Sequence, residues 1–119
     1  MKTVRPGEIN PTQNPHGVEA KRIHENENVQ VVHMLLRPGE NLKKHTTPVD
    51  VFFYVLEGEG IVEIGDEKQM VTKDMLIDSS KDIPHCLYNE GKSNFRVLVV
   101  KTPKPSIAQN KQTIADIKS

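Results

Sequence analysis

Apolar and polar residues alternate with a period of two through most of the chain, which is the repeat of half-buried β-strands. The strongest segments are residues 29–36 and 51–56, and the β-branched and aromatic side chains of the second favour a pleated surface over a helix. A weaker strand begins at Val18, and shorter ones cover residues 61–64, 69–71, 75–77, 83–88 and 95–100. Seven or eight short strands at intervals of about 8–12 residues predict an all-β sandwich or barrel.

Prolines divide the chain into three parts. Residues 1–17 contain three prolines, each of which fixes φ and removes a donor, so we expect an extended N-terminal arm. Residues 18–101 hold the strands and form one barrel domain. Residues 102–119 form a tail in which Ser106 could cap a short helix. That helix either docks loosely or makes a contact between subunits.

Three glycines mark predicted turns. Gly65 with Asp66 suits a tight hairpin, because glycine supplies the positive φ that such a turn needs. Gly39 and Gly58 each stand where a strand begins or ends, and a positive φ is plausible at both. We therefore expect Gly39 and Gly58 to have structural rather than catalytic roles.

Charge and composition exclude several classes of partner. The 16 Lys and Arg residues balance the 16 Asp and Glu residues, and nucleic acids and anionic membranes are usually bound through a basic excess. The longest apolar runs are strand-sized, far too short for a bilayer, and the N-terminus has no apolar signal segment. The single cysteine, Cys86, suits a reducing compartment. We expect a cytoplasmic protein that binds neither nucleic acid nor membrane.

Two stretches resemble the two motifs of the cupin family. The first family motif is G-x5-H-x-H-x3-4-E-x6-G, and here Gly39, His45 and Gly58 fall at the family spacing. The second motif is G-x5-P-x-G-x2-H-x3-N, and here Pro84-His85 and Asn89 match, whereas its glycines and earlier proline do not. Together with the order of the strands, the resemblance covers most of the chain.

The resemblance implies a cupin-type jelly-roll β-barrel, also called a double-stranded β-helix, with a central pocket. In the family, two histidines and a glutamate of the first motif and the histidine of the second hold one divalent metal. The matching positions here are His45, Thr47, Val51 and His85, so two of the four ligands are retained. The alternative spacing for the glutamate places Phe52 there, which is no donor either.

Two hypotheses follow from the incomplete ligand set. In the first, His45 and His85 are polar groups in an otherwise apolar pocket, because Val51, Phe53 and Val55 alternate onto the same wall. Such a pocket, with Thr47 also in it, suits a small organic molecule. A divalent metal, whether iron, nickel, zinc or manganese, would then be weakly held or absent, since even catalytic zinc sites use three protein ligands.

In the second hypothesis, another residue completes a metal site. Asp50, turned inward by a bulge at Pro48, would give two histidines and one carboxylate, the set used by non-haem iron oxygenases. His33 is the other candidate, because it shares a strand face with Val31 and Leu35 that could line the barrel. The chain would then be a metal-dependent cupin enzyme, and a non-haem iron dioxygenase is the type that this ligand set favours.

The remaining cysteine and histidines are not expected to take part in the site. Strand alternation turns Cys86 away from the pocket, where we expect a small buried hydrophobe. His16 and His24 sit in polar, irregular surroundings and are interpreted as surface residues. Phe52, Tyr54 and Leu56 fall on the strand face opposite the pocket, and covering them predicts a homodimer.

Overall fold

The computed structural model of the chain describes residues 1–105, so the helix predicted in the tail from Ser106 onward lies outside the described residues. Within the described part the chain forms nine strands and one short 3-10 turn, η1 (Pro6–Glu8). The strands are β1 (Glu19–Asn26), β2 (Val29–Leu36), β3 (Asn41–His45), β4 (Asp50–Glu57), β5 (Glu59–Ile64), β6 (Glu67–Thr72), β7 (Leu76–Ser79), β8 (His85–Tyr88) and β9 (Phe95–Thr102). This confirms the all-β class. No helix that is long and apolar enough to cross a membrane occurs in residues 1–105.

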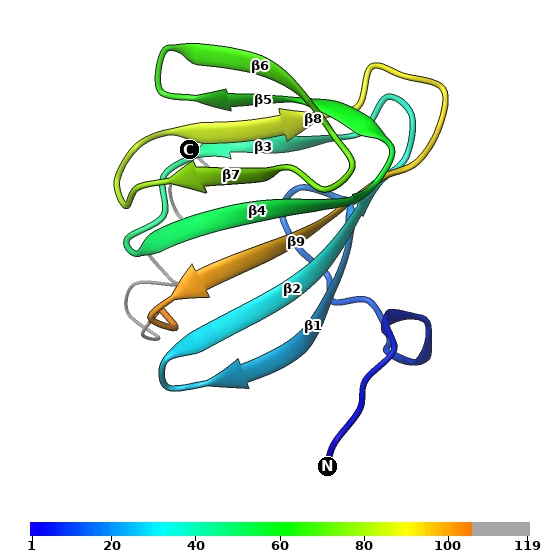
Figure 1. The fold of residues 1–119 in the computed structure, drawn as a ribbon, viewed down its shortest axis with the longest axis vertical. Helices are drawn as coiled ribbons and strands as arrows, with labels where there is room; N and C mark the ends of the chain where they lie inside the picture. The colour runs from blue at the N-terminus through cyan, green and yellow to red at the C-terminus, as the bar shows by residue number, and fades with distance from the viewer. Residues whose placement is uncertain (106–119) are drawn as a thin grey trace.

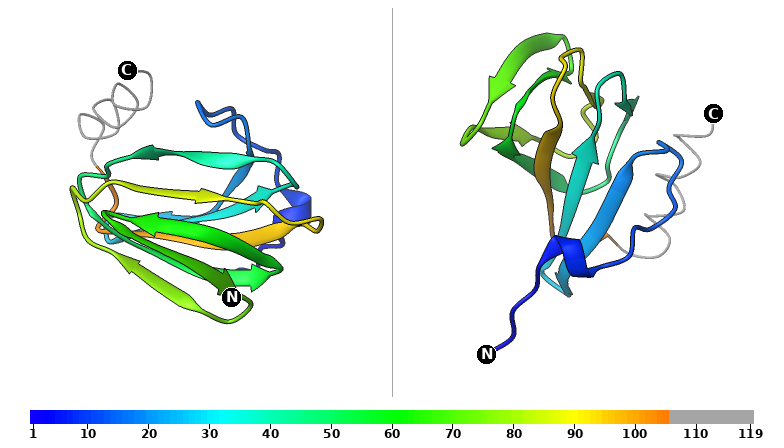
Figure 2. Two further views of the ribbon diagram at one scale, coloured as in Figure 1. Left: turned by 90° about the horizontal axis from the view of Figure 1, so that it is seen from above. Right: turned by 90° about the vertical axis from the view of Figure 1, so that its right-hand side faces the viewer.

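The strands form two antiparallel sheets that face each other (Figures 1 and 2). The first sheet has the order β1-β2-β9-β4-β7, and the second has the order β3-β8-β5-β6. The last strand, β9, therefore lies in the middle of the larger sheet, between β2 and β4. Gly65 and Asp66 form the two-residue turn of the β5–β6 hairpin, as predicted, and Gly65 has a φ of 57°.

Side chains from both sheets meet in one hydrophobic core. On β4 the prediction is confirmed: Val51, Phe53 and Val55 are at most 2% exposed, whereas the alternate residues face outward and are half-buried. Phe95 and Val97 of β9 are fully buried beside them. Removing each such side chain from water contributes about 1.5–3 kcal/mol, so this shared face holds the two sheets together.

The inward face of β2 differs from the prediction. Gln30 and Val32 line the interior and Met34 is buried in the core, so His33 lies on the outer face of the sheet. The expectation that His33 shares the interior with Val31 and Leu35 is therefore wrong. The sequence of β2 is apolar at both parities, so alternation alone does not decide which face is buried.

The strand β3 has no counterpart among the predicted ones. Only Leu42 is apolar and buried in it, and the residues around it are two lysines and an asparagine. It forms the edge of the smaller sheet and pairs with β8 alone, with an irregular register between Leu42 and His45. A short edge strand needs one buried side chain and tolerates lysines on its exposed face, so it leaves little periodic signal.

Gly39 and Gly58 adopt backbone conformations that favour glycine over other residues. Both have the positive φ that the sequence suggested, 88° and 78°. A Cβ on Gly39 would meet nothing within 4 Å, whereas a Cβ on Gly58 would collide with the backbone oxygen of Asn94. We expect Gly39→Ala to lower the free energy of unfolding by about 1–2 kcal/mol, and Gly58→Ala to lower it more. Urea denaturation of both variants checks the order, and equal losses would contradict it.

Candidate functional site

A cavity of about 300 Å³ lies between the two sheets. Its wall is contributed by β1, β2, β4 and β9 of the larger sheet, by β3 and β8 of the smaller one, and by residues 12–16 of the N-terminal arm. The residues named from the sequence as pocket residues all line it: His45, Thr47, Val51, Phe53 and His85. A concave, largely apolar space with a few polar side chains is the usual form of a small-molecule site.

His85 is the most deeply buried of the histidines in the wall, at 2% exposed. Its Nδ1 lies 3.0 Å from Ser79 Oγ, its Nε2 lies 3.4 Å from Thr47 Oγ1, and its ring meets Phe53 edge-on at 5.4 Å. Burial, and then the neighbouring charge of His45, lower the pKa of His85 to about 3. The ring is therefore neutral at pH 7 and held by two hydroxyl groups.

His45 stands at the end of β3, with its ring 4.7 Å from that of His85. Its Nδ1 lies 2.7 Å from the carbonyl oxygen of Lys43. Because a carbonyl oxygen only accepts hydrogen bonds, Nδ1 carries the proton. In the neutral ring Nε2 is then the basic nitrogen.

His16 joins these two histidines, which the sequence interpretation missed. Its ring lies 4.9 Å from the ring of His45 and it lines the cavity, so the interpretation of His16 as a surface residue is wrong. The backbone N–H of Lys43 donates to His16 Nδ1 at 2.9 Å. Burial, and then His45, lower the pKa of His16 to about 4. The neutral ring therefore carries its proton on Nε2, the reverse of His45. His24, by contrast, is exposed as expected.

The fold of the arm explains how His16 reaches the cavity. Thr12 pairs with Ala20 of β1, and the side chain of Asn14 bonds both the carbonyl oxygen of Val18 and the N–H of His16. The arm thus folds back along β1 and reaches the end of β3 (Figure 2). The segment Asn14-Pro15-His16-Gly17 is the available signal, because an Asn side chain bonding two residues ahead is typical of a turn. No periodic pattern in the sequence predicts the direction in which the arm runs.

The residues around His45 and His85 do not fit a divalent metal. Thr47 and Val51 are buried in the cavity wall at the positions where the family pattern has ligands, and neither is an adequate donor. His16 offers a protonated Nε2, which has no lone pair for a metal. In residues 1–105 no group of three or more His, Cys, Asp or Glu side chains is arranged to hold a metal ion.

Neither candidate third ligand points into the cavity. Asp50 is exposed and its Oδ1 accepts the backbone N–H of Lys81 at 2.9 Å, outside the cavity wall. His33 lies on the outer face of β2, where Arg96 donates to its Nε2 at 3.0 Å and its buried Nδ1 has no hydrogen-bond partner among residues 1–105. The bulge that would have turned Asp50 inward does not form, because Asp50 stays in register with Thr102 of β9.

Cys86 is turned away from the cavity and nearly buried, at 8% exposed. Its thiol donates to Glu63 Oε2 at 3.2 Å, and Tyr88 donates to the other oxygen of the same carboxylate. Burial, and then the hydrogen bond to Glu63, raise the pKa of Cys86 to about 11. A thiol that stays protonated is a poor nucleophile and a poor metal ligand.

Comparison with known proteins gives the family. The sequence profile of the cupin domain matches residues 32–101, more than half of the chain, so the chain belongs to the cupin domain family. No curated protein matches the sequence closely enough to add to this. The two antiparallel sheets are accordingly the jelly-roll, or double-stranded β-helix, that the sequence predicted.

Solved structures support the same fold. The protein TT1209 from Thermus thermophilus is 27% identical, with a TM-score of 0.76 over 88% of this chain and 100% of that one. A predicted oxalate decarboxylase from Thermotoga maritima is 21% identical, with a TM-score of 0.78 over 87% and 100%. KdgF from Halomonas sp. is 16% identical, with a TM-score of 0.79 over 89% and 96%. The last two identities are low enough that the likeness concerns the fold alone.

The lowered pKa values of His16 and His85 predict an acid-sensitive fold. In the unfolded chain both rings bind protons below the ordinary pKa of 6.5, whereas in the folded protein they do so only below about 4 and about 3. Between those values the unfolded state holds more protons, so the free energy of unfolding falls as the pH falls from 6.5 toward 4. Denaturation at several pH values should show this slope, and His16→Gln should reduce it. A variant slope equal to the native one would contradict the assignment.

The absence of a fitting ligand set also predicts the response to metal. Added zinc or nickel should be lost from the native protein on dialysis, because only His45 and His85 are placed as family ligands. Replacing Thr47 by His and Val51 by Glu restores the family pattern, and the double variant should retain zinc after the same treatment. The buried glutamate should lower the stability of the metal-free variant, and metal binding should restore that stability. Elemental analysis and calorimetry check both expectations, and stoichiometric metal in the native protein would contradict the first.

Proposed function

We propose that this cupin domain binds a small organic molecule in the cavity between its sheets without a structural or catalytic metal. The observation that carries the proposal is the wall itself: apolar side chains such as Val32, Met34 and Phe53 surround a space into which neutral histidines converge. Hydrophobic walls with a few well-placed polar groups give a ligand both affinity and orientation. The buried free thiol of Cys86 accords with the cytoplasmic location that we propose with it.

The polar groups of the cavity have defined hydrogen-bonding roles that support the proposal. The backbone N–H of Lys43 donates to Nδ1 of His16, and the carbonyl oxygen of Lys43 accepts from Nδ1 of His45. The single residue Lys43 therefore fixes both rings in opposite tautomers. His16 can offer its Nε2–H to an acceptor on the ligand, which fixes the orientation in which a polar group of the ligand enters.

A pair of adjacent substitutions tests whether the cavity is the binding site. Val32 lines the cavity and Val31, the preceding residue of β2, faces the other side of the sheet. Both are half-buried and of equal size, so Val31→Phe is a matched control for Val32→Phe. We expect Val32→Phe to fill the cavity and abolish binding of a neutral aromatic probe, phenylacetamide, while Val31→Phe leaves binding unchanged.

Titration followed by backbone amide NMR provides the measurement. In the native protein, the amides that shift on addition of phenylacetamide should be those of β2, β4, β8 and β9 around the cavity. Thermal unfolding of both variants shows whether either has lost its fold. Binding that survives in a folded Val32→Phe variant, or shifts confined to other surfaces, would contradict the proposal.

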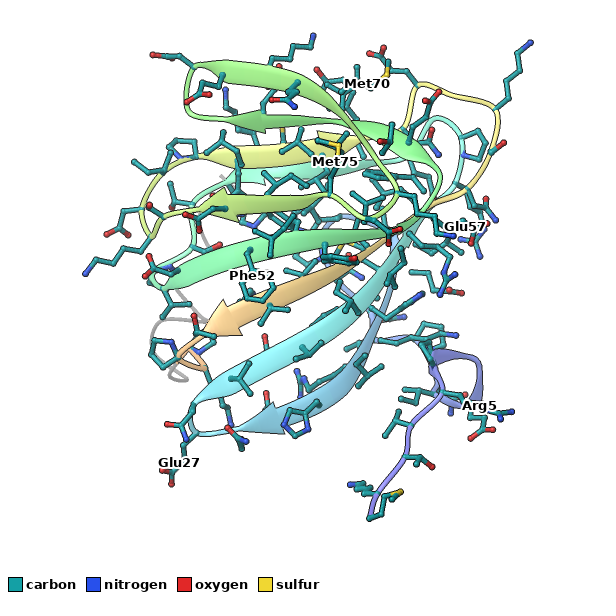
Figure 3. The ribbon with its side chains drawn as sticks, in the orientation of Figure 1. Arg5, Glu27, Phe52, Glu57, Met70 and Met75 are labelled. Atoms are coloured by element: carbon teal, nitrogen blue, oxygen red, sulfur yellow. The ribbon has the colours of Figure 1, made fainter. Side chains whose placement is uncertain are left out.

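We also propose that the chain forms a homodimer through the outer face of the larger sheet. Phe52, Tyr54 and Leu98 lie there, and pairing places Phe52 beside Val100 and Tyr54 between Leu98 and Leu76. Figure 3 shows Phe52 in the middle of this sheet, well away from the turn that carries Glu27. On β7 this face continues with Leu76 beside Tyr54 but with Asp78 beside Phe52, so its apolar part lies mainly on β9 and β4. An exposed apolar patch of this kind is typical of a contact between subunits. A second copy covers it with the same face by two-fold symmetry.

Light scattering checks the dimer. The expected mass is twice the 13.4 kDa of the monomer at micromolar concentration. Tyr54→Glu should shift the mass to the monomer, because it places a charge on the apolar face. Leu76→Glu, at the exposed rim of the same face, should do so less completely, since Leu76 is already 56% exposed. A monomeric native protein would contradict the proposal.

A further inference from the structure

Few polar side chains stand on the inward face of the larger sheet where it lines the cavity. Strand pairing aligns Val32, Val99 and Phe53 in one row across β2, β9 and β4, and Arg22 of β1 stands at the β2 end of this row. The next row, two residues along each strand, places Gln30 beside Lys101 and continues through Val51 to Ser79. Arg22, Gln30 and Lys101 thus lie in two adjacent rows, next to a wall formed by Val32, Val99, Phe53 and Val51.

Lys101 is the unusual member of this row. It lines the cavity and is half-buried, and its ammonium group makes no hydrogen bond or salt bridge with any of residues 1–105. Burial, and then the neighbouring charge of Arg22, lower the pKa of Lys101. A cation withdrawn from water without an anionic partner carries a cost that a bound anion would remove.

Arg22 is a second cation in the same wall. It belongs to β1, at the point where the register with β2 shifts, and its side chain is 54% exposed. The carboxylate nearest to it, Glu25, lies 3.6 Å from Arg22 Nε and also binds Gln30 at 2.7 Å and Lys104 at 3.5 Å. Glu25 does not line the cavity, and neither does any other Asp or Glu within residues 1–105.

We infer that the molecule taken up by this cavity is an organic carboxylate, with its charged group held by Lys101 and Arg22 and its apolar body against Val32, Phe53 and Val99. The inference rests on the proposed binding function and names the ligand class for it. His16 and His85 do not supply this charge, because burial keeps both rings neutral at pH 7. Lys101 and Arg22 are cations in a wall to which residues 1–105 contribute no carboxylate, and a carboxylate is a group that both lysine and arginine bind well.

A pair of probes of nearly equal shape separates the charge from the apolar contact. Phenylacetate and phenylacetamide differ in carrying or lacking the negative charge, and both are titrated into the native protein at pH 7 by calorimetry. We expect phenylacetate to bind about tenfold more tightly or better, since a hydrogen bond to a charged group contributes about 1.5–3 kcal/mol. Lys101→Met should remove most of this preference, and Arg22→Gln, at the more exposed cation, should remove less of it.

Two controls keep the result specific. Lys73→Met removes an exposed lysine that lies outside the cavity, and it should leave the preference for phenylacetate unchanged. Lys101→Met should also melt at a higher temperature than the native protein without ligand, because methionine keeps the aliphatic chain and removes the unpaired charge. A lower melting temperature would contradict the view that Lys101 is held without a partner.

The outcomes distinguish the inference from the proposed function. Tighter binding of phenylacetate that is lost in Lys101→Met supports both. Equal binding of the two probes, or a preference that survives in Lys101→Met, overturns the carboxylate inference and leaves the binding function standing. If neither probe binds to the native protein, the proposed function fails and the inference fails with it.

Discussion

The placement of β9 between β2 and β4 is the constraint on which the site depends. Seven consecutive residue pairs join β2 to β9, and a similar ladder joins β9 to β4. Side chains in such a ladder alternate strictly between faces, so a one-residue slip of β9 would exchange Val99 and Lys101 for outward-facing neighbours. The fully buried Phe95 and Val97 at the other end of β9 oppose that slip. The core therefore fixes both the apolar side chains of the cavity wall and the position of its half-buried cation, Lys101.

The parts of this fold that could be predicted from the sequence are those set by the local alternation of apolar and polar residues. The inward face of β4 and the β5–β6 hairpin are set by local alternation and one glycine, and both were predicted correctly. The inward face of β2 was not, because Val31 and Leu35 compete with Val32 and Met34 and only the pairing with β9 decides between them. The strand β3 was missed because one buried leucine is enough to hold an edge strand.

The site was predictable only in part for a similar reason. The order of the strands and of the loop after β3 follows the family pattern, and the structure brings their residues together in one cavity: His45, Thr47, Val51, Phe53 and His85. His16 lies on the irregular N-terminal arm, which has no periodic pattern. Lys101 and Arg22 belong to strands in which the pairing with neighbouring strands, and not the sequence alone, decides which side chains face inward. The resulting pocket departs from the family pattern in its chemistry: hydroxyl and hydrocarbon replace two ligands, and the charge in the wall is positive. These substitutions fit the recognition of an organic molecule better than the capture of a metal.

The histidines of the cavity, of which His16 and His85 are neutral at pH 7, act in this account as oriented hydrogen-bonding groups and not as metal ligands. Long-range nitrogen-15 NMR of the imidazole rings at pH 7, on protein purified without an affinity tag, tests it most directly. We predict that His16 carries its proton on Nε2 and that His45 carries one on Nδ1. Adding a chelator should leave the ring nitrogen signals of His16, His45 and His85 unchanged. Metal-coordinated nitrogen shifts at His45 and His85 that disappear with chelator would contradict the claim.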